Sequence, residues 1–101
     1  MARFERVITD PRRIHDPAGA YAHGIRAGNL LFVAGQVGTG DGVAEQTRSA
    51  LDGVRAVLAE AGGDLTNVVS TTVYLTDVAD FAAYNEAWVE AFGDHRPARA
   101  P

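Results

Sequence analysis

The sequence contains no cysteine and no lysine, and no apolar run in it approaches the length of a membrane span. Without cysteine, disulfides, thiolate zinc sites and cysteine nucleophiles are excluded. Without lysine, Schiff-base catalysis and the lysine of a phosphate-binding loop are excluded. A bilayer crossing needs roughly 20 apolar residues, and no charged-then-apolar leader opens the sequence. We therefore expect a cytoplasmic protein that does not bind a membrane.

Composition and charge also limit the partners. The 101 residues are 47% hydrophobic and 22% charged, as in ordinary globular proteins, and predict a single domain over residues 1–101. Formal net charge is -4, and all nine basic residues are arginines, scattered except for Arg12 and Arg13. Nucleic-acid binding is disfavoured, because it needs a basic surface that neutralises phosphates.

Residues 27–37 (AGNLLFVAGQV) form the most informative stretch. Gly28 and Asn29 predict a tight hairpin turn, because both residue types tolerate a positive φ. The following residues alternate with apolar side chains on both faces, which predicts a strand in the middle of a sheet. Gly35 near its end leaves the backbone open to close approach, so we expect the edge of a binding site there.

Shorter signals surround this strand. Residues 4–8 predict an edge strand, and residues 21–26 are expected to pair with the central strand across the turn. Residues 38–42 read GTGDG, which matches neither the dinucleotide fingerprint nor a P-loop, so a strand-to-helix connection is favoured over a phosphate cradle.

Residues 45–61 predict the first helix. Apolar side chains recur there at steps of three and four residues, and Gly62 and Gly63 end the pattern. Asp64 is expected to cap a short turn. Residues 68–76, rich in β-branched side chains, predict a second strand.

A second helix is expected after residue 76, with Asp77 or Asp80 as its cap. It carries an aromatic stripe, which is typical of a core: Phe81, Tyr84, Trp88 and Phe92. Gly93 is expected to end the helix, and residues 95–101 predict an extended segment that could begin another strand.

This order of elements predicts an α+β fold in which two helices cover one face of a mixed β-sheet. The other face of residues 30–37 remains apolar and uncovered. Because one chain cannot bury that face, we predict a homo-oligomer. The histidines His15, His23 and His95 have no metal-ligand spacing, so no metal site is expected.

Several segments, in order, resemble the Rid family of enamine/imine deaminases (reactive intermediate deaminases, YjgF/UK114-like). They are residues 27–37, 45–48 (EQTR), 68–77 (VVSTTVYLTD), 80–86 (DFAAYNE) and 97–99 (PAR). The resemblance runs from about Pro17 to the last residue. It implies a chorismate-mutase-like fold, a homotrimer with sites in the clefts between subunits, and no cofactor. The implied reaction is hydrolysis of 2-imino or 2-enamino acids, such as 2-iminopropanoate, to 2-keto acids and ammonia.

The resemblance also implies site residues. Arg99 falls on the family's carboxylate-binding arginine, Tyr21 on its tyrosine after a Gly-Pro pair, Gly35 on the glycine of its Ser-Gly-Gln element, and Asn85 on its second-helix asparagine. A planar guanidinium suits this role, because it binds a carboxylate through two parallel hydrogen bonds and keeps its charge.

The sequence departs from the family pattern in several places. Alanine replaces proline at position 20 and serine at position 34, and Pro101 stands where a cysteine is common. The family's last strands and the acidic residue thought to position the water would follow Pro101, so the chain is expected to be truncated there. A non-catalytic carboxylate-binding trimer therefore remains an alternative to the deaminase. The ribonuclease activity sometimes attached to the family ranks third, because neither a histidine pair nor a basic groove is evident.

Overall fold

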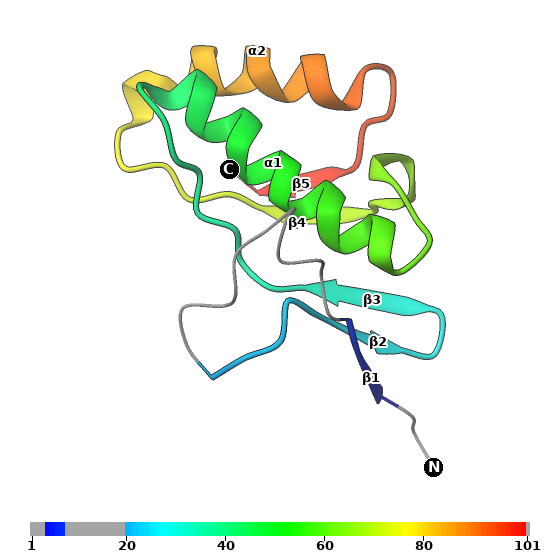
Figure 1. Cartoon of the computed structure of the whole chain (residues 1–101). Helices are drawn as coiled ribbons and strands as arrows, with labels where there is room; N and C mark the ends of the chain where they lie inside the picture. The colour runs from blue at the N-terminus through cyan, green and yellow to red at the C-terminus, as the bar shows by residue number, and fades with distance from the viewer. Residues whose placement is uncertain (1–3, 8–19, 101) are drawn as a thin grey trace.

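The computed structural model describes residues 4–7 and 20–100. The expectations for Ile8, His15, Pro17 and Pro101 lie outside this part. In chain order the elements, with η for a 3₁₀ turn, are β1 (Phe4–Val7), β2 (Gly24–Ala27), β3 (Leu30–Val33), α1 (Val43–Glu60), η1 (Leu65–Asn67), β4 (Ser70–Thr72), η2 (Val78–Asp80), α2 (Phe81–Phe92) and β5 (Ala98–Ala100) (Figure 1).

The first three strands form an antiparallel sheet in the order β1-β2-β3. The predicted hairpin is confirmed, since Gly24 of β2 pairs with Val33 of β3 and Ala27 with Leu30. Its turn uses a positive φ of 63° at Gly28 only, and Asn29 keeps a negative φ. A glycine at the first central position is what a type II′ hairpin turn requires.

The prediction that residues 30–37 form the middle strand of a sheet is wrong for the described part of the chain. β3 is an edge strand, and β2 occupies the centre of its sheet. β3 also ends at Val33, because its partner β2 starts only at Gly24; one further bond, from Ala34 N to His23 O, extends the pairing. Leu30 and Phe32 are 55% and 61% exposed, so the apolar face is uncovered, as the alternation predicted.

The first helix extends two residues further at its start than predicted. The connection before it is a loop, and Gly38 in that loop is sterically required. A Cβ added there would lie 1.8 Å from the Gln46 carbonyl oxygen. The backbone N–H of Asp41 donates to Glu45 Oε2 at 2.8 Å, so this loop uses its own polar groups to start the helix. The expected strand-to-helix connection is confirmed.

The first helix ends just before Gly62 and Gly63, as predicted, and Asp64 caps η1 by accepting a hydrogen bond from Thr66 N. The predicted second strand is shortened to β4. The extended tail becomes β5, which runs parallel to β4 with Thr71 opposite Arg99. Asp77 caps η2 at the start of the second helix, and Gly93 ends that helix with a φ of 61°.

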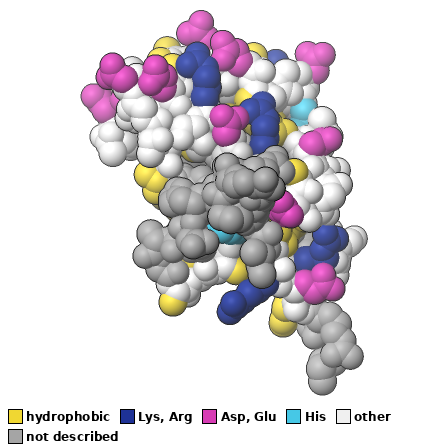
Figure 2. Space-filling model, viewed as in Figure 1, with side chains coloured by type: hydrophobic (Ala, Val, Ile, Leu, Met, Phe, Trp, Pro, Cys, Tyr) yellow, Lys and Arg dark blue, Asp and Glu magenta, His cyan; other side chains and the backbone are white. Residues whose placement is uncertain are grey.

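The core lies between the two helices and the β4–β5 pair. Its buried members come from both helices and η1: Leu51, Leu58, Leu65, Tyr84, Trp88 and Phe92. The predicted aromatic stripe is thus a core stripe, although Phe81 at its start remains 38% exposed. In Figure 1, α1 runs beside α2 and in front of β4 and β5. Charged side chains of both signs are scattered over the helical half of the face in Figure 2.

The expected α+β fold with two helices and strands of both directions is confirmed. The described strands, however, form two hydrogen-bonded groups, β1-β2-β3 and β4-β5, in place of one continuous sheet. No helix in the described ranges is both long enough and apolar enough to cross a membrane.

Candidate functional site

Arg99 is the middle residue of β5, and strand alternation decides where its side chain goes. Ala98 and Ala100 on either side are exposed, whereas Arg99 is partly buried against α2. This is the two-residue period of a strand. The parallel pairing holds the strand in register, with Val73 N donating to Ala100 O at 2.7 Å and Ala98 N to Val69 O at 3.0 Å. The backbone therefore fixes the direction in which the guanidinium points.

Three aromatic rings of α2 surround that guanidinium. Arg99 Cζ lies 5.5 Å from the ring centroid of Phe81, 5.1 Å from that of Tyr84 and 5.2 Å from that of Trp88. All three distances are within the roughly 6 Å at which the negative face of a ring attracts a cation. The stripe that builds the core thus also holds the cation.

Asn85, on the same helix, supplies a hydrogen-bond acceptor. Arg99 Nη1 donates to Asn85 Oδ1 at 2.9 Å, and the bond is partly buried. An amide acceptor fixes the orientation of a guanidinium and leaves its positive charge in place. A carboxylate in the same position would neutralise that charge. The other donors of the fork remain available to a ligand, since a guanidinium has five N–H groups. The structure therefore brings together two of the four predicted site residues.

A hollow of about 280 Å³ opens beside this pair. Its lining comes from α2 and the segment that leads into β5: Asn85, Trp88, Val89, Arg96, Pro97 and Arg99. It therefore combines an apolar wall with an amide and two guanidinium groups, and no carboxylate contributes to it. This arrangement suits a small anion that also has an apolar part.

Tyr84 contributes a buried hydroxyl next to the site. The residue is 1% exposed, and its Oη makes no hydrogen bond of ordinary geometry within residues 4–7 and 20–100, although the guanidinium of Arg99 lies close to it. Burial raises the pKa of this phenol, while the positive charge of Arg99 and its polar contact with the hydroxyl act in the opposite direction. The hydroxyl thus stays protonated at neutral pH.

The other two predicted site residues lie on the three-stranded sheet. Tyr21 precedes β2 and is 52% exposed, and Gly35 follows β3 and is also exposed. Because His23 and Ala34 are hydrogen-bonded, both residues sit at the same end of the hairpin, opposite its turn. A Cβ built at Gly35 meets nothing within 4 Å, so the close approach expected there is not made by described residues. A direct role for either residue stays a prediction.

The described histidines have structural environments. His23 is buried, and His95 donates from Nε2 to Val68 O at 2.6 Å, which ties the segment before β5 to β4. Within the described ranges, no three His, Asp or Glu side chains converge as a metal site would require.

Sequence reasoning missed two features of this site. It assigned the aromatic stripe to the core alone, and it gave Arg96 no role. The stripe's contact with Arg99 depends on the parallel pairing of β4 and β5, which brings together residues 28 positions apart and leaves no local periodicity to detect. The proximity of Arg96 to Arg99 in the sequence was the only available signal for the second cation.

The chain is similar to several known proteins. The family model described as Endoribonuclease L-PSP matches residues 12–101. The RutC family protein PH0854 of Pyrococcus horikoshii is 44% identical over 82% of this chain and 72% of its own length. A rat protein named 2-iminobutanoate/2-iminopropanoate deaminase is 39% identical over 99% of this chain and 79% of its own. Protein mmf2 of Schizosaccharomyces pombe, named as mitochondrial, is 38% identical over 80% and 69%.

Solved structures show the same fold. RidA from an Antarctic Psychrobacter superimposes with a TM-score of 0.88 at 30% identity, covering 95% of this chain and 83% of that one. TdcF of E. coli, solved with bound serine, superimposes with a TM-score of 0.83 at 29% identity, covering 92% and 81%. Relatives of this chain therefore include a protein named as an imine deaminase and a protein that binds a small amino acid.

Proposed function

The chain belongs to the YjgF/RidA/L-PSP (Rid) family, and on that premise we propose that it hydrolyses reactive 2-imino and 2-enamino acids, such as 2-iminopropanoate, to 2-keto acids and ammonia. The observation that carries the proposal is the environment of Arg99. Its guanidinium is oriented by Asn85, faces three rings and lines a hollow without a carboxylate. The deaminase name of the rat relative and the serine bound by TdcF support the same class of ligand.

The carboxylate of a 2-imino acid is its one fixed anion, so it would determine how the substrate binds. The remaining N–H groups of Arg99 can donate hydrogen bonds to this carboxylate in a charge-assisted pair. Such a contact places the adjacent C=N carbon at a defined distance from the guanidinium. The apolar wall formed by Trp88 and Val89 would then receive the side chain of the substrate.

The reaction needs one water and no oxidant. Water adds to the C=N carbon, the nitrogen takes up a proton, and the resulting carbinolamine loses ammonia as the C=O bond forms. An enamine enters the same route after a proton moves to its carbon. We assign Arg99 to binding of the carboxylate, and we propose that Tyr21 and the backbone at Gly35 contact the substrate near its imine group.

We place the complete site between subunits of a homotrimer. Arg99 and Asn85 belong to the β5–α2 side of the fold, whereas Tyr21 and Gly35 lie at the end of the β2–β3 hairpin. The exposed Leu30 and Phe32 on β3 provide an apolar surface for a second copy. A neighbouring subunit could thus bring its hairpin end to the hollow beside Arg99. We also propose that residues 1–101 act as one domain in the cytoplasm, although the relative mmf2 is named as mitochondrial.

Ammonia release tests the proposal. An amino acid oxidase acting on alanine, with catalase present, generates 2-iminopropanoate continuously, and the protein should speed the appearance of free ammonia well above the buffer rate. Heat-denatured protein is the control. A rate equal to buffer, with pyruvate binding retained in a titration, would replace the deaminase with a non-catalytic carboxylate binder.

The family description also names a ribonuclease, but the described site does not favour that activity. His23 is buried and His95 is held by a backbone carbonyl, so neither is placed as a catalytic acid or base toward RNA.

A further inference from the structure

The hollow beside Arg99 contains a second arginine that binding of a simple 2-imino acid does not require. Arg96 lines the hollow together with Arg99, and none of the other lining residues is acidic. The whole chain has a net charge of -4, whereas the lining of this hollow has two positive side chains and no negative one. Such a local excess of one charge attracts an anion.

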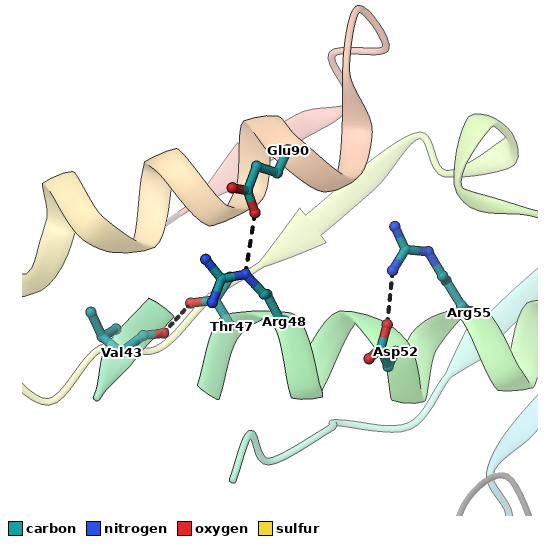
Figure 3. Close-up of polar contacts among 6 residues, drawn as sticks. All are labelled: Val43, Thr47, Arg48, Asp52, Arg55 and Glu90. Carbon is teal, nitrogen blue, oxygen red and sulfur yellow. Dashed lines mark hydrogen bonds and ion pairs between the residues drawn. The ribbon is translucent and has the colours of Figure 1, made fainter. Parts of the chain in front are cut away.

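The two arginines on α1 differ from Arg96, because each forms an ion pair with a carboxylate. Arg48 pairs with Glu90 across the two helices at 3.2 Å, and Arg55 pairs with Asp52 one turn away at 2.8 Å (Figure 3). Arg96, in contrast, makes no hydrogen bond or ion pair with any residue in the described ranges, and its side chain is exposed. Its charge is therefore available to a ligand.

The two guanidinium groups differ in how they are held. Arg99 lies on a paired strand and is fixed by Asn85 and by ring contacts. Arg96 lies three residues earlier, before Pro97, whose ring restricts the backbone. Three extended residues span at most about 10 Å, so both side chains can reach one small molecule. The guanidinium of Arg99 is thus held in one orientation, whereas the exposed side chain of Arg96 can adjust its position beside the same hollow.

We propose that this site prefers 2-imino acids with a second acidic group, namely 2-imino dicarboxylates of four or five carbons. Arg99 binds the carboxylate next to the imine, and Arg96 binds the distal carboxylate. The inference rests on the proposed function, since it names the substrate class of that same site. A hollow of about 280 Å³ is small compared with pockets for drug-sized ligands, and it suits a metabolite of this size.

Binding of stable keto acids tests the preference without any turnover. 2-Oxoglutarate and 2-oxopentanoate have the same carbon chain, and only the first has a second carboxylate. In calorimetric titrations at low salt, the wild-type protein should bind 2-oxoglutarate at least tenfold more tightly. Arg96→Gln should reduce that ratio to near one, and Arg96→Lys should keep part of it. Arg55→Gln removes the same charge from α1, outside the lining of the hollow, and should keep the full ratio.

Added salt should lower the ratio in the wild-type protein, because an exposed cation is screened by ions. Equal affinities for the two keto acids in the wild-type protein would overturn the inference. A ratio that survives in Arg96→Gln would also overturn it, since the preference would then come from another group.

The same comparison in turnover separates this inference from the proposed function. The matching imines are generated from glutamate and norvaline by suitable amino acid oxidases, and kcat/KM is compared. A binding preference without ammonia release from either imine would contradict the proposed deaminase and support the preference. Ammonia release at equal efficiency from both imines would support the deaminase and contradict the preference.

Discussion

Arg99 Nη1 on β5 donates a hydrogen bond of 2.9 Å to Asn85 Oδ1 on α2, and this bond connects the two elements that form the candidate site. Asn85 is exposed to the hollow on one side and lies next to Tyr84 in the sequence. In the proposed reaction its amide would act on the substrate only through the orientation of Arg99. This makes Asn85 a positioning residue, which leads to the first prediction.

Asn85→Ala should raise KM for 2-iminopropanoate about tenfold with a smaller change in kcat, because a hydrogen bond to a charged group contributes ~1.5 kcal/mol or more. Asn85→Asp should raise KM further, since a carboxylate beside Arg99 would compete with the substrate for the cation. Initial rates of ammonia release over a range of substrate concentrations measure both. An unchanged KM in both variants would show that Asn85 does not orient the guanidinium.

Tyr84→Phe should leave the free energy of unfolding unchanged or raise it by up to ~1 kcal/mol. The reason is that the buried hydroxyl makes no hydrogen bond of ordinary geometry in the described part of the chain, and an unsatisfied buried polar group is costly. Tyr84→Ala, which removes the ring as well, should cost about 3 kcal/mol or more. Urea unfolding at one fixed protein concentration measures the series. A clear decrease in the free energy of unfolding for Tyr84→Phe would mean that the hydroxyl gains a hydrogen-bond partner in the assembled protein.

Because its pKa is lowered in the folded protein, Asp64 should contribute to the free energy of unfolding at neutral pH and lose that contribution in acid. Hydrogen bonds from the Thr66 side chain and backbone lower this pKa below its usual value. Because the folded state prefers the ionised form, its contribution is complete above the unfolded pKa of about 3.9 and is lost as pH falls further. Thr66→Ala should move the Asp64 pKa back toward its usual value, as measured by NMR titration of the carboxyl group. No movement would assign the shift to the backbone bond alone.

Phe32→Glu should break the assembly while the chain stays folded. Phe32 is 61% exposed in the single chain, so a charged side chain is tolerated there, but it would be costly in an apolar interface. Light scattering at micromolar concentration should give the mass of three chains for the wild-type protein and a smaller mass for the variant, with unchanged circular dichroism. A monomeric wild-type protein would contradict the proposed trimer.

The local parts of the fold could be predicted from the sequence because short-range rules govern them. The turn at Gly28, the cap at Asp64 and the end of α2 at Gly93 each depend on a few neighbouring residues, and each lies where it was expected. The position of β3 in its sheet could not be predicted in the same way. Apolar residues on both faces show that two surfaces need burial, but they do not say whether the same chain or another copy buries them.

In the candidate site, too, some features could be predicted from the sequence and others depend on contacts distant in the chain. Arg99 and Asn85 came from the resemblance to the family, and their side chains meet in the structure. The ring contacts of Arg99 depend on the register of β5 against β4, with Arg99 opposite Thr71, and no local pattern in the sequence encodes that pairing. The positions of Tyr21 and Gly35 relative to Arg99 would depend on contacts between copies of the chain, which remain a proposal.

The most direct test is the effect of Arg99 substitutions on ammonia release from freshly generated 2-iminopropanoate. Arg99→Ala should lower kcat/KM by about a hundredfold or more, because the substrate carboxylate loses a charge-assisted pair worth roughly 3 kcal/mol. Arg99→Lys should be intermediate, since it keeps the charge but loses the planar fork. Arg55→Gln, which removes an arginine from the surface of α1, should match the wild-type protein. Wild-type rates in Arg99→Ala would contradict the assignment of Arg99 as the group that binds the substrate.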